Sequence, residues 1–254
     1  MIEIFRALKN GIQTQFHPKM VFATFLPLIA GLSVFIIFCI FVWSGINHWL
    51  MTSTSDWWIL NQISNILNEV GLSAHGLGEF AAWIVTLICV IVMSIICGIV
   101  VAGIFVTPIA VNLISKSHFP YLSREGKYAT SISILNSFKV TLLFALGWLL
   151  TLPLWLIPGL NIILPIFWMS YAYANMTKVD SIVEHASPTE RQYLLENYKG
   201  GFWFIGLVCA LLSLIPFLGL VMPVFSILAC THYGLSLLDI HRKENRFLPT
   251  VPSK

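Results

Sequence analysis

Residues 154–167 read LWLIPGLNIILPIF, which places two prolines, a glycine and an asparagine inside a long segment without a charged side chain. The pattern returns at residues 212–225, which read LSLIPFLGLVMPVF. Seven of the fourteen positions are identical in a gapless alignment, at a constant offset of 58 residues. Because proline and glycine interrupt regular helix, each copy predicts a turn within an apolar segment.

The composition around these copies is that of an integral membrane protein. Of 254 residues, 57% are hydrophobic and only 10% are charged, with a mean hydropathy of +0.85, whereas a soluble domain carries about 25% charged residues. Four stretches contain no Asp, Glu, Lys or Arg: residues 20–55, 80–115, 140–177 and 200–238. Each exceeds the roughly 20 residues that one membrane-crossing helix needs. The lipid bilayer is therefore the first predicted partner, and a net charge of +3 is too small to indicate nucleic acid.

The positions of the basic residues predict the topology. Residues 47–79 contain no Lys or Arg, whereas all other connecting segments and both termini contain several. Because basic residues accumulate on the cytoplasmic side, we expect residues 47–79 to lie outside and both termini to be cytoplasmic. Residues 18–50 and 80–115 are then two transmembrane helices that cross once each.

The last two stretches, residues 140–177 and 200–238, must each enter and leave on the cytoplasmic side, so we predict two re-entrant helical hairpins. The proline motifs divide them into arms of about 18 residues, which reach about 27 Å against a hydrocarbon core of about 30 Å. Shallow hairpins and full crossings therefore both remain open. Polar backbone groups at such turns need partners, and Asn161 is well placed to bond to them. The tip residues, turn formers first and pathway candidates second, are Pro158, Gly159, Asn161, Pro216 and Gly219. We expect the two tips to come together around a common axis, as in transporters built from repeats.

Shorter signals complete a single membrane domain that spans residues 1–254. Residues 1–16 space Phe5, Leu8, Ile12 and Phe16 as on one helix face, which predicts an interfacial amphipathic helix or, alternatively, a simple flanking turn. Ser187, Pro188 and Glu190 form a capping-box pattern, so a cytoplasmic helix is expected over residues 187–198.

A stripe of small residues lies within the second transmembrane stretch. Ser94, Gly98 and Ala102 recur every four residues, a spacing that lets another helix approach closely. The stripe predicts a helix-packing seam, either between subunits of a homo-oligomer or within the protomer.

No pattern typical of an enzyme, a cofactor site or a metal site is present. The five cysteines all lie in apolar stretches without CxxC spacing, as expected of membrane or core residues. His232 is the one imidazole well inside an apolar stretch, where it lines a path or bonds to a carbonyl of a neighbouring helix. Asp180, Glu184 and His185 cluster after the first hairpin and are expected to form a solvated loop face.

Taken together, the two hairpin motifs IPGLN…LP and IPFLG…MP, the segment HPKMVFATFLPLIAG and the short helix between the hairpins resemble the CysZ-type sulfate permease family, which includes the etoposide-induced-protein homologues. The resemblance is densest over residues 135–243. It implies two transmembrane helices, two hemi-penetrating hairpins, an oligomer and a bacterial inner membrane location. In the sulfate permeases it also implies proton-linked or passive sulfate uptake.

The chain departs from the permeases in one place. They carry a Gly-x-Arg-Arg run at a helix start, where this chain has Lys19, Met20, Val21 and Phe22. The sequence accordingly resembles the uncharacterised branch of the family more closely than the sulfate permeases. A helix N-terminus with a nearby cation still holds an oxyanion, so His17 and Lys19 are predicted as a weak anion site. The alternative is that Lys19 is an ordinary basic flank of the helix.

Two functions therefore remain open. The first is a permease or channel for sulfate or another small anion. The second is a non-transporting membrane scaffold that assists envelope or lipid homeostasis, which the missing arginine pair favours.

Overall fold

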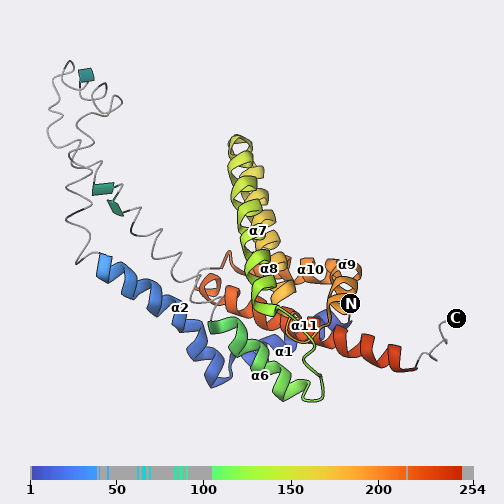
Figure 1. Cartoon of the computed structure of the whole chain (residues 1–254). Helices are drawn as coiled ribbons and strands as arrows, with labels where there is room; N and C mark the ends of the chain where they lie inside the picture. Colours follow the sequence, from blue (N-terminus) through green and yellow to red (C-terminus); the bar gives the residue numbers. More distant parts are fainter. Residues whose placement is uncertain are drawn as a thin grey trace. The chain divides into compact units, whose positions relative to one another are not determined.

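The computed structural model describes residues 2–38, 40, 45, 62, 65–66, 69, 83–84, 86–87, 90, 105–215 and 217–247 (Figure 1). In this part of the chain the regular elements are all helical: α1 (Ile2–Gln15), α2 (Pro18–Ile37), α6 (Thr107–His118), α7 (Ala129–Thr151), η3 (Leu152–Leu156), α8 (Leu160–Asp180), α9 (Pro188–Asn197), α10 (Lys199–Leu212) and α11 (Leu218–Phe247). The predicted all-α fold is confirmed to this extent. Most of the outer segment 47–79, the seam of Ser94, Gly98 and Ala102, and Pro216 lie outside the described residues.

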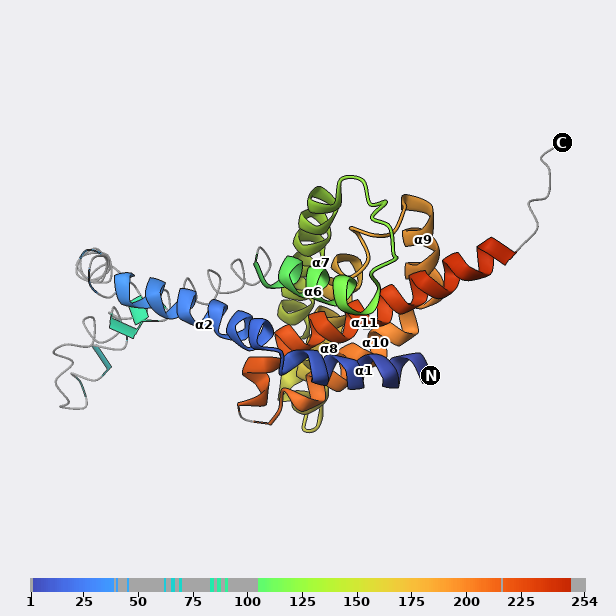
Figure 2. The same ribbon diagram turned by 90° about the horizontal axis from the view of Figure 1, so that it is seen from below.

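The chain divides into two units, Met1–Thr24 with Phe105–Lys254 and Phe25–Ile104. In the first unit α11 is the central helix. Helices α1, α6, α8 and α10 all pack against it, and α1 and α6 lie alongside it in Figure 2. Of its most apolar eighteen-residue window, 67% is buried, against 6% for the window in Ala129–Leu156. Two helices of similar composition thus have opposite roles, one in the core and one on the surface.

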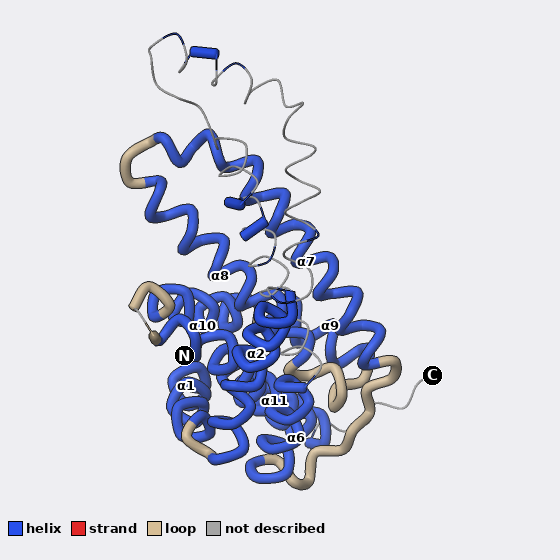
Figure 3. The backbone as a smooth tube through the Cα atoms, turned by 90° about the vertical axis from the view of Figure 1, so that its left-hand side faces the viewer, coloured by secondary structure: helices blue, strands red, loops and turns tan. Residues whose placement is uncertain are grey.

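The first proline motif forms the turn of a helical hairpin. Helices α7 and α8 run side by side and are joined at Ile157–Gly159 (Figure 3). Gly159 has a φ of 91°, which a residue without a side chain adopts readily. The Gly159 N–H donates to Asn161 Oδ1 at 3.1 Å, as the sequence predicted. Asn161 therefore satisfies a backbone group at the tip.

The hairpin arms are longer than the sequence indicated. Helix α7 has 23 residues and α8 has 21, so they extend roughly 34 and 32 Å. The expected length of about 18 residues was too small, because the charge-free stretch begins only at residue 140. Helix α7 begins at Ala129 and therefore includes Lys139. Each arm of the observed hairpin is as long as a hydrocarbon core of about 30 Å.

The second motif repeats the turn, but the two helices that it joins differ in length. Helix α10 has only 14 residues and α11 has 30, about 21 and 45 Å, so the prediction of equal arms is wrong here. Phe217 has a φ of 69°, and it occupies the position that aligns with Gly159 at the offset of 58. Gly219 lies inside the first turn of α11 rather than at the tip. The two copies therefore share a left-handed residue at the turn, which a bulky side chain disfavours.

The N-terminal segment is helical, as predicted, and its two faces differ. Ile4, Ala7, Gly11 and Thr14 are buried, and a Cβ on Gly11 would lie 3.2 Å from the Phe225 ring of α11. The opposite face leaves large apolar side chains exposed: Ile2, Phe5, Ile12 and Phe16. Small residues let α1 approach α11 closely, and the exposed apolar face suits a membrane surface.

His232 of α11 fixes the same contact. Its Nε2 lies 2.9 Å from the Thr14 hydroxyl of α1, and its ring meets His118 of α6 edge to face with centroids 4.7 Å apart. The structure thus shows His232 bonded to a neighbouring helix, which is one of the two roles expected for it. Its partner is a hydroxyl group.

Candidate anion-binding site

Helix α6 and the loop that follows it carry most of the candidate site. Pro108 lies in the first turn of α6 and Lys116 in its last turn. The helix ends at His118, where Phe119 and Pro120 form a turn and the Leu122 N–H donates to the Phe119 carbonyl at 3.0 Å. This turn directs the next residues, up to Arg124, back along α6.

A first cavity of about 460 Å³ is lined by Lys19, Pro108, Ile109, Asn112, Leu113 and Lys116; we call it the Lys19 cavity. It brings together two ammonium groups and one side-chain amide. Among the ion pairs within the described residues, none includes Lys19 or Lys116. These cations are available to an anionic ligand.

The N-terminus of α2, where the sequence places a weak anion site, has its amides already occupied. The Lys19 N–H donates to His17 Nδ1 at 3.3 Å. The Met20 and Val21 N–H groups donate to the His17 carbonyl at 2.8 and 3.0 Å. Any contribution of Lys19 to anion binding therefore comes from its side chain unless His17 moves. The joint assignment of His17 and Lys19 stays a prediction.

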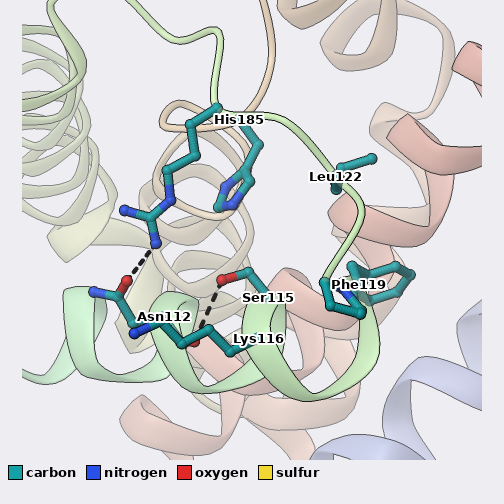
Figure 4. Close-up of a pocket in the computed structure, with 8 residues that line it drawn as sticks. Asn112, Ser115, Lys116, Phe119, Leu122 and His185 are labelled. Carbon is teal, nitrogen blue, oxygen red and sulfur yellow. Dashed lines mark hydrogen bonds between the residues drawn. The ribbon is translucent and has the colours of Figure 1, made fainter.

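A second cavity of about 320 Å³ adjoins the first and shares Asn112 and Lys116 with it (Figure 4). We call it the Arg124 cavity. Its other lining residues are Ser115, Phe119, Pro120, Leu122, Arg124 and His185. Arg124 donates to Asn112 Oδ1 and lies 3.6 Å from the Glu184 carboxylate. The two cavities together present three cations, with one carboxylate beside Arg124.

His185 is the polar residue that the sequence placed wrongly. The cluster of Asp180, Glu184 and His185 was expected to be a solvated loop face, but His185 is only 1% exposed and its Nδ1 has no hydrogen-bond partner. Burial lowers the pKa of His185 to about 4, and the charges of Arg124 and Arg242 act in the same direction. The imidazole is therefore neutral at pH 7.

Arg242 fixes the wall of this cavity from α11. Its guanidinium donates to the His185 carbonyl at 2.9 Å and to both carboxylate oxygens of Glu190 at 2.8 and 3.0 Å. Glu190 also completes the predicted capping box with Ser187, which the structure confirms. Burial raises the pKa of Glu190, but the hydrogen bonds from Arg242 and Ser187 outweigh this effect and hold the pKa at about 2.

The two turns lie apart from each other, and the first lies away from α6. The α7–α8 turn is at the end of its hairpin opposite α6, and the turn between α10 and α11 lies apart from it in both views (Figures 1 and 3). Within one chain the tips do not come together as expected. Asn161 and Gly159 therefore act at the turn, and a pathway role for the tip residues stays a prediction.

The sequence identified one cation of the site and missed the others. Lys116 and Arg124 appeared only as basic residues that set the topology, and Asn112, Ser115 and His185 carried no motif. Pro120, directly after His118 and Phe119, is the one local sequence feature that favours a turn beside α6. Nothing in the sequence places His185 next to that turn.

Within the part of the chain that the structure describes, three helices suit a membrane crossing by length and composition: Pro18–Ile37, Ala129–Leu156 and Leu218–Asn245. Together with the basic cavities beside α6, they define the class: an all-helical membrane protein with a candidate site for anions.

The chain belongs to the family described as Sulfate transporter CysZ/Etoposide-induced protein 2.4, which matches residues 7–223. No curated protein and no solved structure matches the chain. The match covers α1 from Ala7, the first proline motif, residues 212–223 of the second and every residue of the two cavities. It supports a sulfate transporter-like function at the level of the family.

Proposed function

We propose that this protein transports sulfate or a similar small oxyanion, and that the Lys19 cavity binds the ion. The observation that carries the proposal is the gathering of Lys19, Lys116 and Asn112 around one cavity in a chain of this family. Ammonium groups compensate the charge of the ion, and the amide of Asn112 donates a hydrogen bond. The Lys19 N–H donates to the His17 ring. If the ion also binds the N–H groups at the start of α2, the His17 side chain moves away and releases this donor.

Uptake of radiolabelled sulfate into proteoliposomes tests this proposal. Lys19→Gln and Lys116→Gln each remove one cation from the cavity, and loss of a charge-assisted hydrogen bond of about 1.5 kcal/mol weakens binding about tenfold. Lys127→Gln is the matched control, because Lys127 is an exposed lysine that lines neither cavity. Absence of uptake by the wild-type protein, together with no thermal stabilisation by sulfate, would reject the proposal.

The membrane arrangement forms part of the proposal. Both termini lie in the cytoplasm of a bacterium, the protein resides in the inner membrane, and the two proline-motif segments are re-entrant hairpins. The lack of Lys and Arg in residues 47–79 and the largely unburied surface of Ala129–Leu156 support this arrangement. A reporter fused at Asn61 is expected to be periplasmic and one at Glu190 cytoplasmic, and the reverse result would refute it.

The exposed apolar side chains of α7 also support a homo-oligomer, because such a surface suits either lipid or a second copy of the chain. Cross-linking of the reconstituted protein tests this part, and a monomer under all conditions would contradict it.

A non-transporting scaffold for envelope or lipid homeostasis is the second candidate function. It is favoured by one observation: the Lys19 N–H, at the first position of the segment that replaces the Gly-x-Arg-Arg run, is bonded to the protein's own His17. This function predicts no anion current in reconstituted bilayers and a partner that co-purifies, so reproducible currents would exclude it. We expect no enzymatic activity with either function.

A further inference from the structure

The Arg124 cavity contains a set of polar groups that the proposed transport site does not use. Ser115, Arg124 and His185 line this cavity alone, whereas Asn112 and Lys116 line both. Its volume of about 320 Å³ falls at the lower end of the range for small-molecule sites, about 300–1,000 Å³. The cavity is therefore large enough for a small ion with some of its water.

The charges in the cavity favour an anion. Lys116 has no ion-pair partner among the described residues, and the Arg124 side chain is 48% exposed, with Glu184 as its only carboxylate neighbour there. Arginine has five N–H donors in a planar fork, and the contacts with Asn112 and Glu184 leave several of them free. A fork with free donors beside an ammonium group matches the geometry of sulfate and phosphate oxygens.

His185 supplies the second, independent observation. Its imidazole points from the loop before α9 toward Ser115 of α6 (Figure 4). The residue is 1% exposed, yet Nδ1 has no protein partner. A buried polar group without a hydrogen bond costs about 1–3 kcal/mol, and a ligand in the cavity that His185 lines would supply a partner.

We propose that the Arg124 cavity is a second anion site, which binds a tetrahedral oxyanion of the sulfate or phosphate type through Arg124, Lys116 and His185. The oxyanion is either a free ion or the phosphate of a lipid headgroup. Lys116 and Asn112 line both cavities, so the two sites are adjacent and share a cation. Binding at this site does not depend on whether the protein transports the ion.

Isothermal titration of the full chain in detergent tests the proposal with three probes: sodium sulfate, sodium phosphate and dihexanoyl phosphatidic acid. Arg124→Gln removes a cation that lines only this cavity, Lys19→Gln removes one that lines only the Lys19 cavity, and Lys127→Gln removes one that lines neither. We expect Arg124→Gln to weaken binding of at least one probe about tenfold or more, while Lys127→Gln binds like wild type. The probe whose affinity depends on Arg124 identifies the source of the oxyanion.

Unchanged affinity for all three probes in Arg124→Gln would overturn the proposal. Arg124 is half exposed, so this variant is expected to fold, and a thermal scan checks that it does. Sulfate uptake that is absent while Arg124-dependent binding persists would reject the transport function alone.

The ring nitrogens of His185 provide a second measurement, one that reports on this side chain directly. Nitrogen NMR of histidine-labelled protein is expected to show one ring signal that shifts on addition of the bound probe and is missing in His185→Gln. A His185 signal that stays fixed at saturating probe would show that the imidazole takes no part, and would overturn the site as proposed.

Discussion

Arg242 offers a quantitative test of the fold around the candidate site, because its side chain joins α11 to three other segments. Its guanidinium bonds to Glu190 of α9 at 2.8 and 3.0 Å and to the His185 carbonyl at 2.9 Å. It also donates to the carbonyl and hydroxyl oxygens of Ser123 at 3.1 and 2.9 Å, and lies 3.2 Å from the Glu125 carboxylate. The side chains of Arg242 and Glu190 are only 13% and 16% exposed.

Arg242→Gln leaves the Glu190 carboxylate charged and largely buried without its counter-ion. Removal of one partner from a buried ion pair costs about 3–5 kcal/mol. Because both side chains are slightly exposed, we expect a loss at the lower end of this range, about 3 kcal/mol. Glu190→Gln is expected to cost less, because glutamine still serves the capping box and leaves Arg242 its other acceptors. In the double variant the two losses are expected to be less than additive, with a coupling energy of about 2 kcal/mol.

Guanidinium denaturation in detergent, followed by far-UV circular dichroism, measures these differences from the midpoints and slopes. Lys127→Gln is the control, because Lys127 is exposed and takes part in none of the ion pairs found among the described residues, and its midpoint is expected to equal that of wild type. A loss below about 1 kcal/mol for Arg242→Gln, or additive losses in the double variant, would refute the assignment.

Three further predictions concern single positions. The pKa of His185 falls from its ordinary 6.5 to about 4 in the folded protein, so the unfolded chain binds the extra proton between these values. Stability therefore decreases as pH falls through this window, by at most about 3 kcal/mol, and thermal melts of His185→Gln should lack this slope. Gly206→Ala places a methyl group 2.6 Å from the Ser170 carbonyl oxygen, whereas Gly200→Ala meets nothing within 4 Å on the same helix. Denaturation should show a loss of about 1–3 kcal/mol for the former and none for the latter, and equal effects would contradict the packing. Gly159→Ala should destabilise and Phe217→Gly stabilise by about 1 kcal/mol each, because both positions have positive φ; effects of the same sign would show that the turns differ.

Local features of the fold followed directly from the sequence. The capping box of Ser187 and Glu190, the helix at the N-terminus and the turn at Gly159 with its Asn161 bond each depend on residues within a few positions of one another. Backbone preference and short-range hydrogen bonds decide such features, so the local sequence contains the necessary information. The offset of 58 also located the second turn, whereas the positive φ of Phe217 was found only in the structure.

The candidate site depends on contacts between distant segments. Lys19, Lys116, Arg124 and His185 come from four separate parts of the chain, and only the reversal after α6 and the packing of α11 bring them to adjoining cavities. The His185 carbonyl accepts a hydrogen bond from Arg242, which is 57 residues further along. No periodicity or motif encodes such a meeting.

Which apolar helix is central was likewise decided by the tertiary structure. The windows in Ala129–Leu156 and Leu218–Asn245 have nearly equal mean hydropathy, 1.7 and 1.6, yet 6% of the first is buried and 67% of the second. In a soluble protein exposure to water would separate core from surface by composition. In a membrane protein lipid and protein interior accept the same apolar side chains, so the sequence determines that a helix is apolar, and only packing decides whether it faces other helices.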